Sequence, residues 1–503
     1  MVLDVSRENT GVNFTHDVLD RRPPQDPALI ELARDGARRE WTFGEIGERS
    51  ARLAGALRAR GVRRGDVVMT LVGNRSEWVA TMCACFHIGA VVLPCTEQLR
   101  AKDLRLRLDL ARPSMLIADE RNRTELEAAR PDCDVALVPD ETLFAAEPAA
   151  PVELTDSDPC LITFTSGTSG EPRAVVHGQR YLHGQRLQAE HWLGAHAGEL
   201  VWCTAASGWS KSARNVFIAP WLCGARALLH DARFDPHERL EILERERVSV
   251  LCMAPTEYRV IAKHAVLRPL ADLRGMVAAG EALNPEVLSA FKQSTGLEIR
   301  DGYGQTETGQ LTGAPPGESA RPGSMGRALP GIALRIEEGE LTVDPATVPT
   351  FFLGYLGEGV RRGEDGAWSV EDRRDGGSWH TGDRVDEDSD GWLHFEGRND
   401  DLIISAGYRI GPFEVESALV AHPAVAEAAA VAAPDEERGA VVRAVVVLRE
   451  GDHSPSPELV RELQEHVKRE TAPYKYPRIV DFVTELPKTA SGKVKRAELR
   501  AET

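Results

Sequence analysis

The sequence predicts a large α/β domain followed by a small α+β domain. Over most of the chain, short apolar runs alternate with charged segments that favour helices, which is typical of α/β proteins. After about Arg398 the expected order changes to helix, strand, helix and strand, which indicates a separate α+β unit. The 503 residues, of which 42% are hydrophobic, are enough to form several buried cores.

The first helix is predicted by a capping box at Thr42–Glu45. Leu53 and Leu57 would then lie on one side of this helix, and Gly61 is expected to end it. The apolar run at Asp66–Val72 follows as a strand.

The longest apolar run is Trp78–Leu93. His87 and a break at Gly89–Ala90 interrupt it, so we interpret this run as a buried helix that leads into a buried strand and not as a membrane span. Further strands are expected at Cys160–Phe164, Arg226–His230, Val248–Ala254 and Gly275–Ala279.

The C-terminal region has its own pattern. A helix is expected at Pro412–Val420 and a strand at Ala440–Leu448, and a strand at Arg478–Val483 ends the series. Between the last two strands, Leu459, Leu463 and Val467 recur every four residues, which predicts a helix. We therefore place one domain at residues 1–398 and a second at 399–503.

Composition limits the function classes. The net charge of −18 argues against nonspecific binding to nucleic acid. All eight cysteines lie between Cys83 and Cys252 without paired metal-ligand spacing, which favours reduced thiols in a cytosolic enzyme. The first residues, Met1–Arg22, contain no apolar signal segment. We expect a cytoplasmic protein, and the sequence leaves its oligomeric state open.

The most informative segment is the loop at Thr165–Arg173, which follows an apolar strand. Glycines can turn backbone N–H groups inward to form an anion nest, and the hydroxyl groups of Thr165, Ser166, Thr168 and Ser169 add donors. The loop is not a Walker A motif, because Glu171–Arg173 replaces its Gly-Lys-Ser/Thr ending. A flexible surface turn would be the better interpretation if this segment stood alone.

Further segments follow in a fixed order: Ala279–Ala282, Asp301–Glu307, Trp379–Asp383, Gly397–Asp401 continuing to Gly407–Arg409, and Leu486–Lys493. With these segments the sequence resembles the adenylate-forming superfamily, and most closely the AMP-forming medium-chain acyl-CoA synthetases. The resemblance covers nearly the whole chain. It implies a large N-terminal domain that binds ATP and the acid, and a small mobile C-terminal lid that carries a catalytic lysine.

The chemistry of these residues suits a nucleotide. The ring of Tyr303 could stack on adenine, and Gly280 and Gly302 would let the backbone approach the base. Asp383 could accept hydrogen bonds from both ribose hydroxyls, and Arg398 could hold ribose or the α-phosphate. The alternatives are that Asp383 caps a turn, that Tyr303 belongs to a core, and that Arg398 pairs with Asp400 or Asp401.

Thr306 suits a phosphate and Glu307 a magnesium ion, because Mg²⁺ prefers one or two carboxylates together with phosphate oxygens. The resemblance implies that the complete ATP-binding set is Thr165, Ser166, Gly167, Thr168, Ser169, Gly170, Arg173, Gly280, Glu281, Ala282, Asp301, Gly302, Tyr303, Gly304, Gln305, Thr306, Asp383, Arg398 and Arg409.

Lys493 is the expected catalytic residue. A cation that touches both the attacking carboxylate and the α-phosphate lowers their repulsion in the transition state. Without the preceding Ser491–Gly492, a solvated lysine in a basic tail would be the default interpretation. The resemblance implies that the C-terminal domain carries Lys493 and rotates about a hinge at Asp400 between two half-reactions. It also implies CoA contacts at Gly407, Tyr408, Arg438 and Lys468, although charged surface residues are usually only solvated.

The sequence departs from the family at Arg173, where the loop usually has lysine. Arginine keeps the positive charge, so we expect phosphate neutralisation to survive, with Arg173 in an exposed turn. The segment from Glu337 to Asp375 is also compressed and aligns least well with the family.

The acyl pocket is expected at Ala205–Lys211. The resemblance places Trp209 beside the reacting carboxylate, where its ring would shorten a linear tunnel, with Gly280 and Gly304 at the border of the pocket. Lys211 could line the pocket or point to solvent. Trp221, further along, is expected to be a core residue.

The expected activity is that of an acid–thiol ligase. ATP and a small-to-medium or aryl carboxylic acid would give acyl-AMP and pyrophosphate, and CoA would then displace AMP, with Mg²⁺ as the cofactor. One alternative is transfer to the phosphopantetheine of a carrier protein. Another is a catalytically silent nucleotide-binding homologue, which the presence of Lys493, Glu307 and Asp383 argues against.

Overall fold

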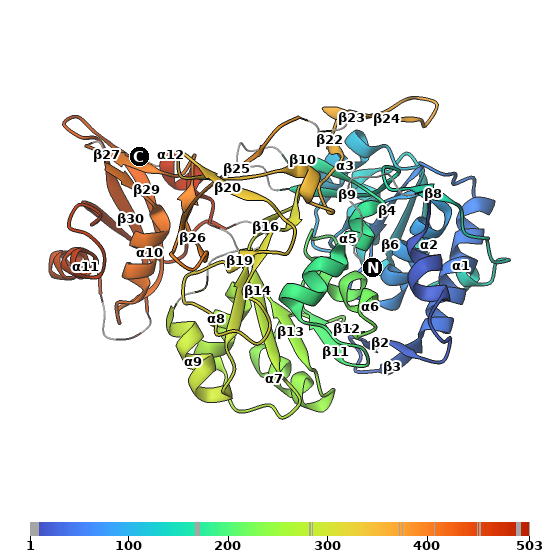
Figure 1. Ribbon diagram of the computed structural model, residues 1–503, viewed down its shortest axis with the longest axis horizontal. Coiled ribbons are helices and arrows are strands. Elements are labelled where there is room, and N and C mark those ends of the chain that lie inside the picture. The colour runs from blue at the N-terminus through green and yellow to red at the C-terminus, as the bar shows by residue number, and fades with distance from the viewer. Residues whose placement is uncertain are drawn as a thin grey trace.

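Two large β-sheets form the body of the molecule, as the computed structural model shows (Figure 1). The structure describes residues 10–165, 172–280, 283, 285–371, 373–374, 376–406, 408–449, 451, 454–488 and 494–501. Within these ranges the first sheet has, in spatial order, β24 (Trp368–Val370), β23 (Gly359–Arg362), β22 (Gly354–Leu356), β10 (Arg173–Gly178), β9 (Pro159–Thr165), β5 (Val91–Cys95), β4 (Val67–Leu71), β6 (Met115–Asp119) and β7 (Asp134–Val138).

The second sheet runs, again over the described residues, in the order β15 (Ile299–Gly302), β14 (Gly275–Ala279), β13 (Val250–Met253), β11 (Leu200–Cys203), β12 (Arg226–His230), β2 (Pro27–Leu32) and β3 (Arg38–Thr42). All neighbouring strands from β15 to β2 are parallel, and only β3 is antiparallel to its neighbour. The carboxyl ends of the parallel strands therefore meet along one edge, where ligand sites are common in α/β proteins.

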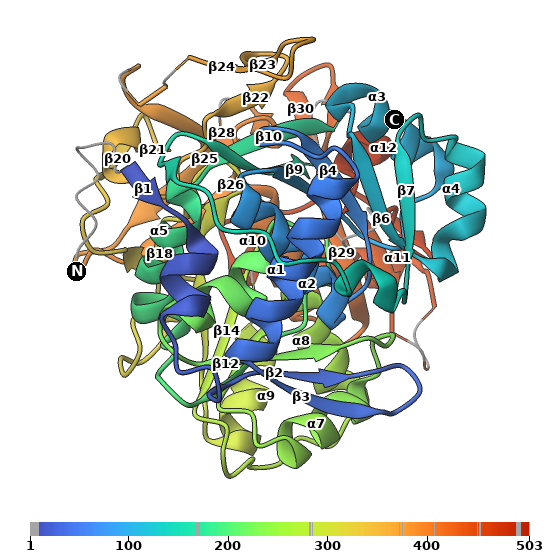
Figure 2. The ribbon, with the colours of Figure 1, turned by 90° about the vertical axis from the view of Figure 1, so that its right-hand side faces the viewer.

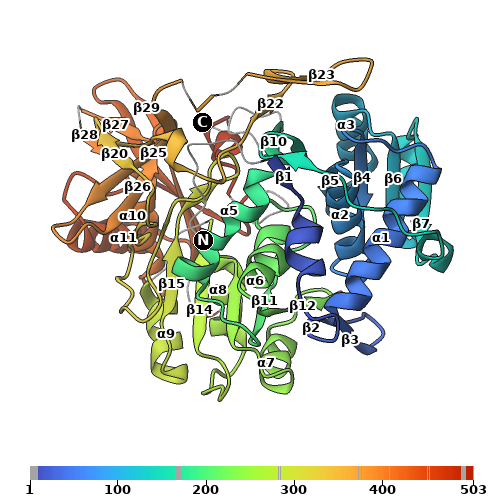
Figure 3. The same cartoon turned by 45° about the vertical axis from the view of Figure 1, so that its right-hand side comes forward.

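Helices lie between the two sheets and on both outer faces (Figures 2 and 3). Alternate residues of β4 show the layering, because Val68 faces the core between the sheets whereas Val67 and Met69 face the outer layer. The central helices are α1 (Phe43–Ala59), α2 (Ser76–Ile88), α5 (Arg180–Gln188) and α6 (Ala219–Leu222); the outer ones are α3 (Ala101–Ala111) and α4 (Arg123–Ala129) on the first sheet, and α7 (Pro236–Arg245), α8 (Pro255–His264) and α9 (Pro285–Thr295) on the second.

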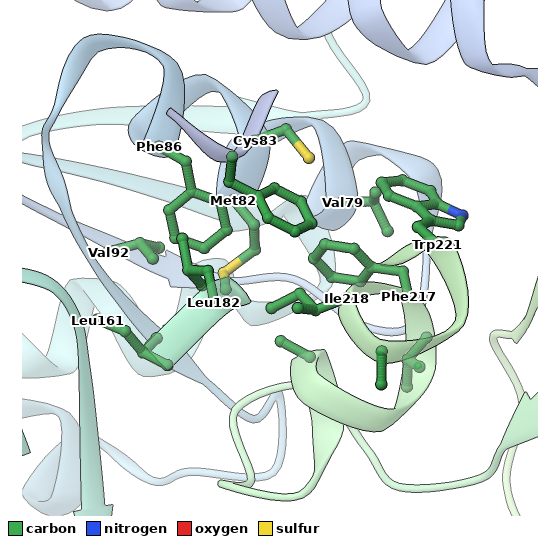
Figure 4. Close-up of a cluster of buried hydrophobic side chains, with 14 of the residues drawn as sticks. Val79, Met82, Cys83, Phe86, Val92, Leu161, Leu182, Phe217, Ile218 and Trp221 are labelled. Atoms are coloured by element: carbon green, nitrogen blue, oxygen red, sulfur yellow. The ribbon is translucent and has the colours of Figure 1, made fainter. Parts of the chain in front are cut away.

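The central core is built around α2, every residue of which is buried. Figure 4 shows Met82 and Phe86 of α2 facing Leu182 of α5 and Phe217 from the helical turn η5 (Arg214–Ile218). Trp221 is fully buried, and its indole N–H donates a hydrogen bond to the Ala28 carbonyl at 2.9 Å. The expectation that Trp221 is a core residue is therefore confirmed.

Smaller elements connect the body to the C-terminal region. A four-stranded sheet in the described ranges consists of β20 (Leu334–Glu337), β21 (Glu340–Val343), β25 (Trp379–Glu387) and β26 (Leu393–Arg398). Short pairs are formed by β1 (Thr10–Val12) with β8 (Leu154–Thr155), β16 (Gly304–Gln305) with β17 (Gly309–Gln310), and β18 (Thr312–Gly313) with β19 (Arg327–Ala328); the remaining helical turns are η1 (Thr15–Asp20), η2 (Glu120–Asn122), η3 (Glu141–Phe144), η4 (Ala189–Leu193) and η6 (Pro345–Thr347).

The elements that follow β26 lie together at one end of the molecule (Figure 1), and they have hydrophobic clusters of their own, made of residues between Ile403 and Leu499. Its elements are β27 (Ile403–Ser405), β28 (Tyr408–Ile410), α10 (Pro412–Val420), β29 (Val425–Asp435), β30 (Gly439–Leu448), α11 (Pro457–Glu470), β31 (Ile479–Val483) and α12 (Arg496–Ala501). This arrangement agrees with the predicted fold class, whereas the boundary between residues 398 and 399 stays a prediction.

Most predicted elements are present. The Thr42 hydroxyl and the Glu45 carboxylate form the expected capping box, and α1 ends at Ala59, just before Gly61. The Trp78–Leu93 run divides into α2 and β5 as expected. No helix in the described ranges is long and apolar enough to cross a membrane.

Candidate active site

The predicted phosphate loop begins where β9 ends. Thr165 is the last residue of β9 and pairs with Arg173, the first residue of β10. The Thr165 hydroxyl donates a hydrogen bond to the Arg173 carbonyl at 3.4 Å. The two strands thus form a base for the loop between them, whose predicted phosphate-binding residues Ser166, Gly167, Thr168, Ser169 and Gly170 lie outside the described residues.

Arg173 is held in place by an aromatic ring. Its guanidinium lies 3.3 Å from the centroid of the Tyr355 ring and donates a hydrogen bond of 2.7 Å to Glu358. Arg173 is exposed as expected, but the expectation of a turn was wrong, because Arg173 begins β10 and packs on Tyr355 of the neighbouring β22. A planar guanidinium stacks on such a ring better than an ammonium group does, which gives a physical reason for arginine here.

Tyr355 also connects Arg173 to Glu307. Its hydroxyl donates a hydrogen bond of 2.8 Å to a Glu307 carboxylate oxygen. No group of three or more His, Cys, Asp or Glu side chains suited to a metal ion occurs among the described residues. A single carboxylate at Glu307 fits Mg²⁺, which takes its other ligands from water and phosphate oxygens. Tyr355 lies in the compressed segment after Glu337, where no motif pointed to it.

Asp383 is the centre of the predicted nucleotide site. Its side chain is buried, and one of its oxygens accepts hydrogen bonds from the Tyr303 hydroxyl at 2.5 Å and from the Gln305 amide at 3.0 Å. The other oxygen pairs with Arg398 at 3.3 Å, and Arg398 also donates a hydrogen bond to Asp400 at 3.1 Å. The structure thus brings four predicted ATP-site residues together, and Arg398 has the ion pair with Asp400 that the sequence analysis left open.

Tyr303 is half-buried and packs against two hydrophobic clusters. The hydrogen bond to Asp383 fixes its ring, and burial together with the Asp383 charge raises the pKa of its hydroxyl, which keeps the hydroxyl a donor. Its part-buried position is compatible with both the predicted adenine stacking and the core alternative. Thr306 lies in the turn that follows and contacts the buried His177 ring through its backbone.

The glycines of this segment have packing reasons of their own. A Cβ on Gly302 would lie 2.4 Å from the Gln310 amide nitrogen and 2.6 Å from the Trp192 indole nitrogen. On Gly304 it would lie 1.9 Å from the Gly309 carbonyl oxygen, across the pair of strands. Both positions therefore require glycine without any ligand, and their predicted contacts with ATP and the acid stay predictions.

Lys211 lies against the end of β14. Its ammonium donates a hydrogen bond of 2.7 Å to the Ala279 carbonyl, and it covers Gly280, which has a φ of +101°. Glu281 and Ala282, which follow, lie outside the described residues. Lys211 is half-buried and contacts the strand end, whereas the alternatives that it lines the pocket or points to solvent stay predictions.

Asp301, at the end of β15, is also close enough to Lys211 to be affected by its charge. Desolvation raises the pKa of the Asp301 carboxyl group to about 8, although the Gly302 N–H and Lys211 both act to lower it. The carboxyl group is therefore mostly neutral at physiological pH.

The rest of the predicted acyl segment crosses the end of β5. Gly208 has a φ of +89°, and a Cβ there would lie 2.2 Å from the Thr96 backbone nitrogen. This close approach explains the glycine before Trp209, whose side chain is half-buried.

Arg214, which the sequence analysis missed, follows at the start of η5 and is 4% exposed. A charged residue at the head of the apolar run Val216–Leu222 was the signal that could have found it.

The C-terminal region contributes the remaining candidates. Tyr408 is 52% exposed and stacks on Tyr474 with ring centroids 4.4 Å apart. The Arg438 carbonyl accepts a hydrogen bond of 3.0 Å from Ala406, so Arg438 adjoins the turn between β27 and β28. Lys468 pairs with Glu465 at 2.5 Å on α11. Gly407, Lys493 and the side chain of Arg409 lie outside what the structure describes.

The chain resembles known proteins over its whole length. A model of the AMP-binding enzyme family matches residues 16–356, and one of the AMP-binding enzyme C-terminal domain matches residues 414–493. The human mitochondrial acyl-coenzyme A synthetase ACSM4 is 38% identical over 97% of this chain and 90% of its own. The uncharacterised acyl-CoA ligase YtcI of Bacillus subtilis is 38% identical over 95% of this chain and 93% of its own.

Solved structures agree with these matches. An anthranilate CoA ligase in complex with anthranoyl-AMP superposes with a TM-score of 0.87 at 27% identity, covering 99% of each chain. A benzoate CoA ligase from Burkholderia xenovorans superposes with a TM-score of 0.83 at 27% identity, covering 97% of this chain and all of the other. The chain therefore belongs to the AMP-binding enzyme family.

Proposed function

We propose that this protein is an ATP-dependent acyl-CoA synthetase. It activates a small-to-medium or aryl carboxylic acid as acyl-AMP with release of pyrophosphate and then transfers the acyl group to CoA. Full-length similarity to acyl-CoA synthetases supports this function. Its main support in the structure is the cluster at Asp383, where Tyr303, Gln305 and Arg398 converge on one buried carboxylate.

In the first half-reaction, a carboxylate oxygen of the acid forms a bond to the α-phosphorus of ATP. The bond between the α- and β-phosphates breaks, and pyrophosphate leaves with the electron pair. Asp383 holds the ribose and Arg398 the ribose or α-phosphate, while the loop between β9 and β10 surrounds the departing phosphates. Lys493 stabilises the charge that develops between the attacking carboxylate and the phosphate.

In this proposal Arg173 and Glu307 act on the phosphates that leave as pyrophosphate. Arg173 neutralises charge on the β- or γ-phosphate, and the Tyr355 ring keeps its guanidinium from swinging away. Mg²⁺, when bound by Glu307, supplies further charge neutralisation on the phosphate oxygens. The hydrogen bond from Tyr355 orients the Glu307 carboxylate for this role.

In the second half-reaction, the sulfur of CoA attacks the acyl carbonyl carbon and AMP leaves. The turn between β27 and β28 carries Gly407, where pantetheine passes the backbone, and Tyr408 and Arg438 lie beside that turn. Lys468, on the same small domain, is a further CoA contact in this proposal. We also place the enzyme in the cytoplasm, because all eight of its cysteines are free thiols.

The test is AMP and pyrophosphate release by the purified protein over a panel of linear, branched and aromatic acids, with ATP and Mg²⁺. We expect acid-dependent release of both products and formation of acyl-CoA when free CoA is added. If the acyl group is transferred only to the phosphopantetheine of a carrier protein, that carrier protein and not CoA is the acceptor. Highest kcat/KM with palmitate or a longer acid would contradict the proposed size class, and no acid-dependent turnover would refute the activity.

A further inference from the structure

Two cations of the predicted acyl region, Lys211 and Arg214, have no carboxylate partner in the part of the chain that the structure describes. Neither Lys211 nor Arg214 has an oxygen of an acidic side chain within ion-pair distance among the residues that the structure describes. Lys211 donates instead to a backbone carbonyl, at 2.7 Å. Arg214 is the more deeply buried of the two, at 4% exposed, and its Nε has no hydrogen-bond partner.

The neighbours of Arg214 do not neutralise it. The Tyr181 hydroxyl forms a hydrogen bond with its side chain, but burial raises the pKa of this phenol, so Tyr181 stays uncharged. The His177 ring lies against Tyr181 with centroids 3.9 Å apart, and the backbone of Thr306 forms a hydrogen bond with it. Burial lowers the pKa of His177 to about 3, and the Arg214 charge adds to this effect, so His177 is neutral as well.

Arg214 begins η5, three residues after Lys211, and η5 packs against β11 and β12 of the second sheet. The thiol of Cys252, at the end of β13, is influenced by the charges of both Lys211 and Arg214. On the other side, the backbone of Thr306 contacts the His177 ring that adjoins Arg214. Because Lys211 touches the end of β14 at Gly280, the two cations and the predicted acyl pocket share one end of the second sheet.

A buried charge without a counterion is costly, and elsewhere this protein avoids the cost. Arg239 is 5% exposed and pairs with Glu257 at 3.4 Å. Arg300 is 6% exposed and donates to the carbonyls of Trp192, Leu193 and Ala314. Within the described ranges Arg214 has no acidic partner, and the Tyr181 hydroxyl that forms a hydrogen bond with it is uncharged.

We propose that Arg214 binds a second, non-reacting carboxylate of the acid, so that the preferred substrates are short dicarboxylic acids. This inference rests on the proposed function and narrows its substrate class. One carboxylate of the diacid reacts at the α-phosphate, while the distal one accepts hydrogen bonds from the Arg214 guanidinium. Lys211, between the two ends, adds positive charge that lowers the cost of burying two carboxylates.

The test compares each diacid, from succinate to suberate, with its own monomethyl ester. The ester keeps one reacting carboxylate and nearly the same shape, and it lacks only the distal charge. We expect kcat/KM in the pyrophosphate assay to be about 10- to 100-fold higher for the best diacid than for its ester, which is the usual value of a hydrogen bond to a charged group. Equal or better turnover of the esters would overturn the inference.

Variants at Arg214 test whether this residue causes the preference for the diacid over its ester. Arg214→Met removes the charge at similar volume and should abolish the preference for the diacid, whereas Arg214→Lys should keep part of it. The control is Arg186→Met on α5, which removes one exposed cation paired with Glu190 and should leave the preference unchanged. A preference that survives in Arg214→Met would assign it to another residue and overturn the inference.

Thermal unfolding separates a binding role from a structural one. Without substrate, Arg214→Met should unfold at the wild-type temperature or above it, because it removes an uncompensated buried charge. The diacid with ATP should raise the unfolding temperature of wild type and not that of Arg214→Met. A destabilised variant with unchanged discrimination would overturn the inference. If no acid is turned over, the proposed function fails. A rise in unfolding temperature caused by the diacid in wild type and absent in Arg214→Met would still support a carboxylate site at Arg214.

Discussion

The charges on the predicted nucleotide side of the site are paired with one another, whereas the cations on the predicted acyl side lack an acidic partner within the described ranges. On the nucleotide side Asp383 meets Arg398, and Arg173 meets Glu358. On the acyl side, Lys211 and Arg214 have no acidic partner among the described residues. Under the proposed function, this difference teaches that the groups predicted to bind ATP are held in place before ATP arrives, whereas the proposed dicarboxylic substrate would neutralise the cations on the acyl side.

This difference has an energetic consequence. Where groups are paired, removal of one partner leaves the other unsatisfied, so both stability and substrate binding should suffer. Where a cation is unpaired, its removal should harm only the handling of substrate. The two sides can therefore be distinguished by measuring activity and unfolding temperature on the same variants.

The largest effect is expected at Lys493, a cation that the C-terminal domain would bring to the site. Lys493→Ala should lower the adenylation rate about 10²- to 10³-fold, because it removes charge stabilisation specific to that transition state. When acyl-AMP and CoA are supplied, release of AMP should continue near the wild-type rate. Both half-reactions are measured by product release in a quenched assay.

The matched control for this prediction is Lys495→Ala, two residues away, where the side chain pairs with Glu498 at 2.7 Å. It should leave adenylation unchanged. Equal losses in both half-reactions of Lys493→Ala would mean that the lysine is structural or that one conformation serves both steps. The rotating-domain part of the proposal would then be withdrawn.

Asp383→Ala tests the paired side directly. It removes the acceptor for ribose and leaves Tyr303 and Arg398 without their partner, so the KM for ATP should rise about 10- to 100-fold. Stability should fall by about 1–2 kcal/mol, because Asp383 is buried and Arg398 is partly exposed. Steady-state kinetics and thermal unfolding measure the two effects.

Asp386→Ala on the same strand is the control, since Asp386 is exposed. It should change neither quantity. An ATP KM that remains at the wild-type value in Asp383→Ala, together with a lower unfolding temperature, would mean that Asp383 only organises the fold.

A smaller effect is expected at Arg173. Arg173→Ala should raise the KM for ATP or lower kcat about tenfold, and Arg173→Lys should be milder because it keeps the charge without the planar stacking on Tyr355. Arg361→Ala, an exposed residue on β23, is the control and should behave as wild type. Unchanged kinetics for Arg173→Ala would assign its contacts with Tyr355 and Glu358 to the fold alone.

Much of the fold could be predicted because local signals were strong. The bounds of β12, β14 and α10 agree with the predicted ones, since apolar runs there are framed by charged or turn residues. The edge strands β22 to β24 were not predicted, because their short segments have no long apolar pattern and depend on pairing with β10.

The site was predictable where ordered motifs carry it and not where it depends on tertiary contacts. Asp383 and Tyr303 come from motifs, and the structure brings them together. Tyr355 and Arg214 do not, because only the folded chain places Tyr355 under Arg173 and surrounds Arg214 with neutral groups. Sequence motifs therefore indicated the chemistry, whereas the charge that we propose selects the substrate became visible only in the folded structure, where no acidic partner for it is described.

The smallest predicted effect concerns Asp301, whose carboxyl group lies between the two sides. Its pKa is raised to about 8 in the folded protein, whereas the ordinary value is 3.8. Between these values the folded state keeps a proton that the unfolded state has released, so this group makes stability fall as the pH rises from about 4 to about 8. The Asp301→Asn variant has no ionisable group at this position, so its stability should not show this fall with pH.

The measurement is the difference in unfolding temperature between Asp301→Asn and wild type, without ligands, over that pH range. The difference should increase towards pH 8 and then level off, by about 1–3 °C in all, because the side chain is only half-buried and the chain is long. Asp386→Asn, an exposed carboxylate, should give a flat difference. A flat difference for Asp301→Asn would mean that Asp301 is ionised and pairs with the Lys211 charge. In that case Lys211 would belong with the paired groups, and the contrast between the two sides would rest on Arg214 alone.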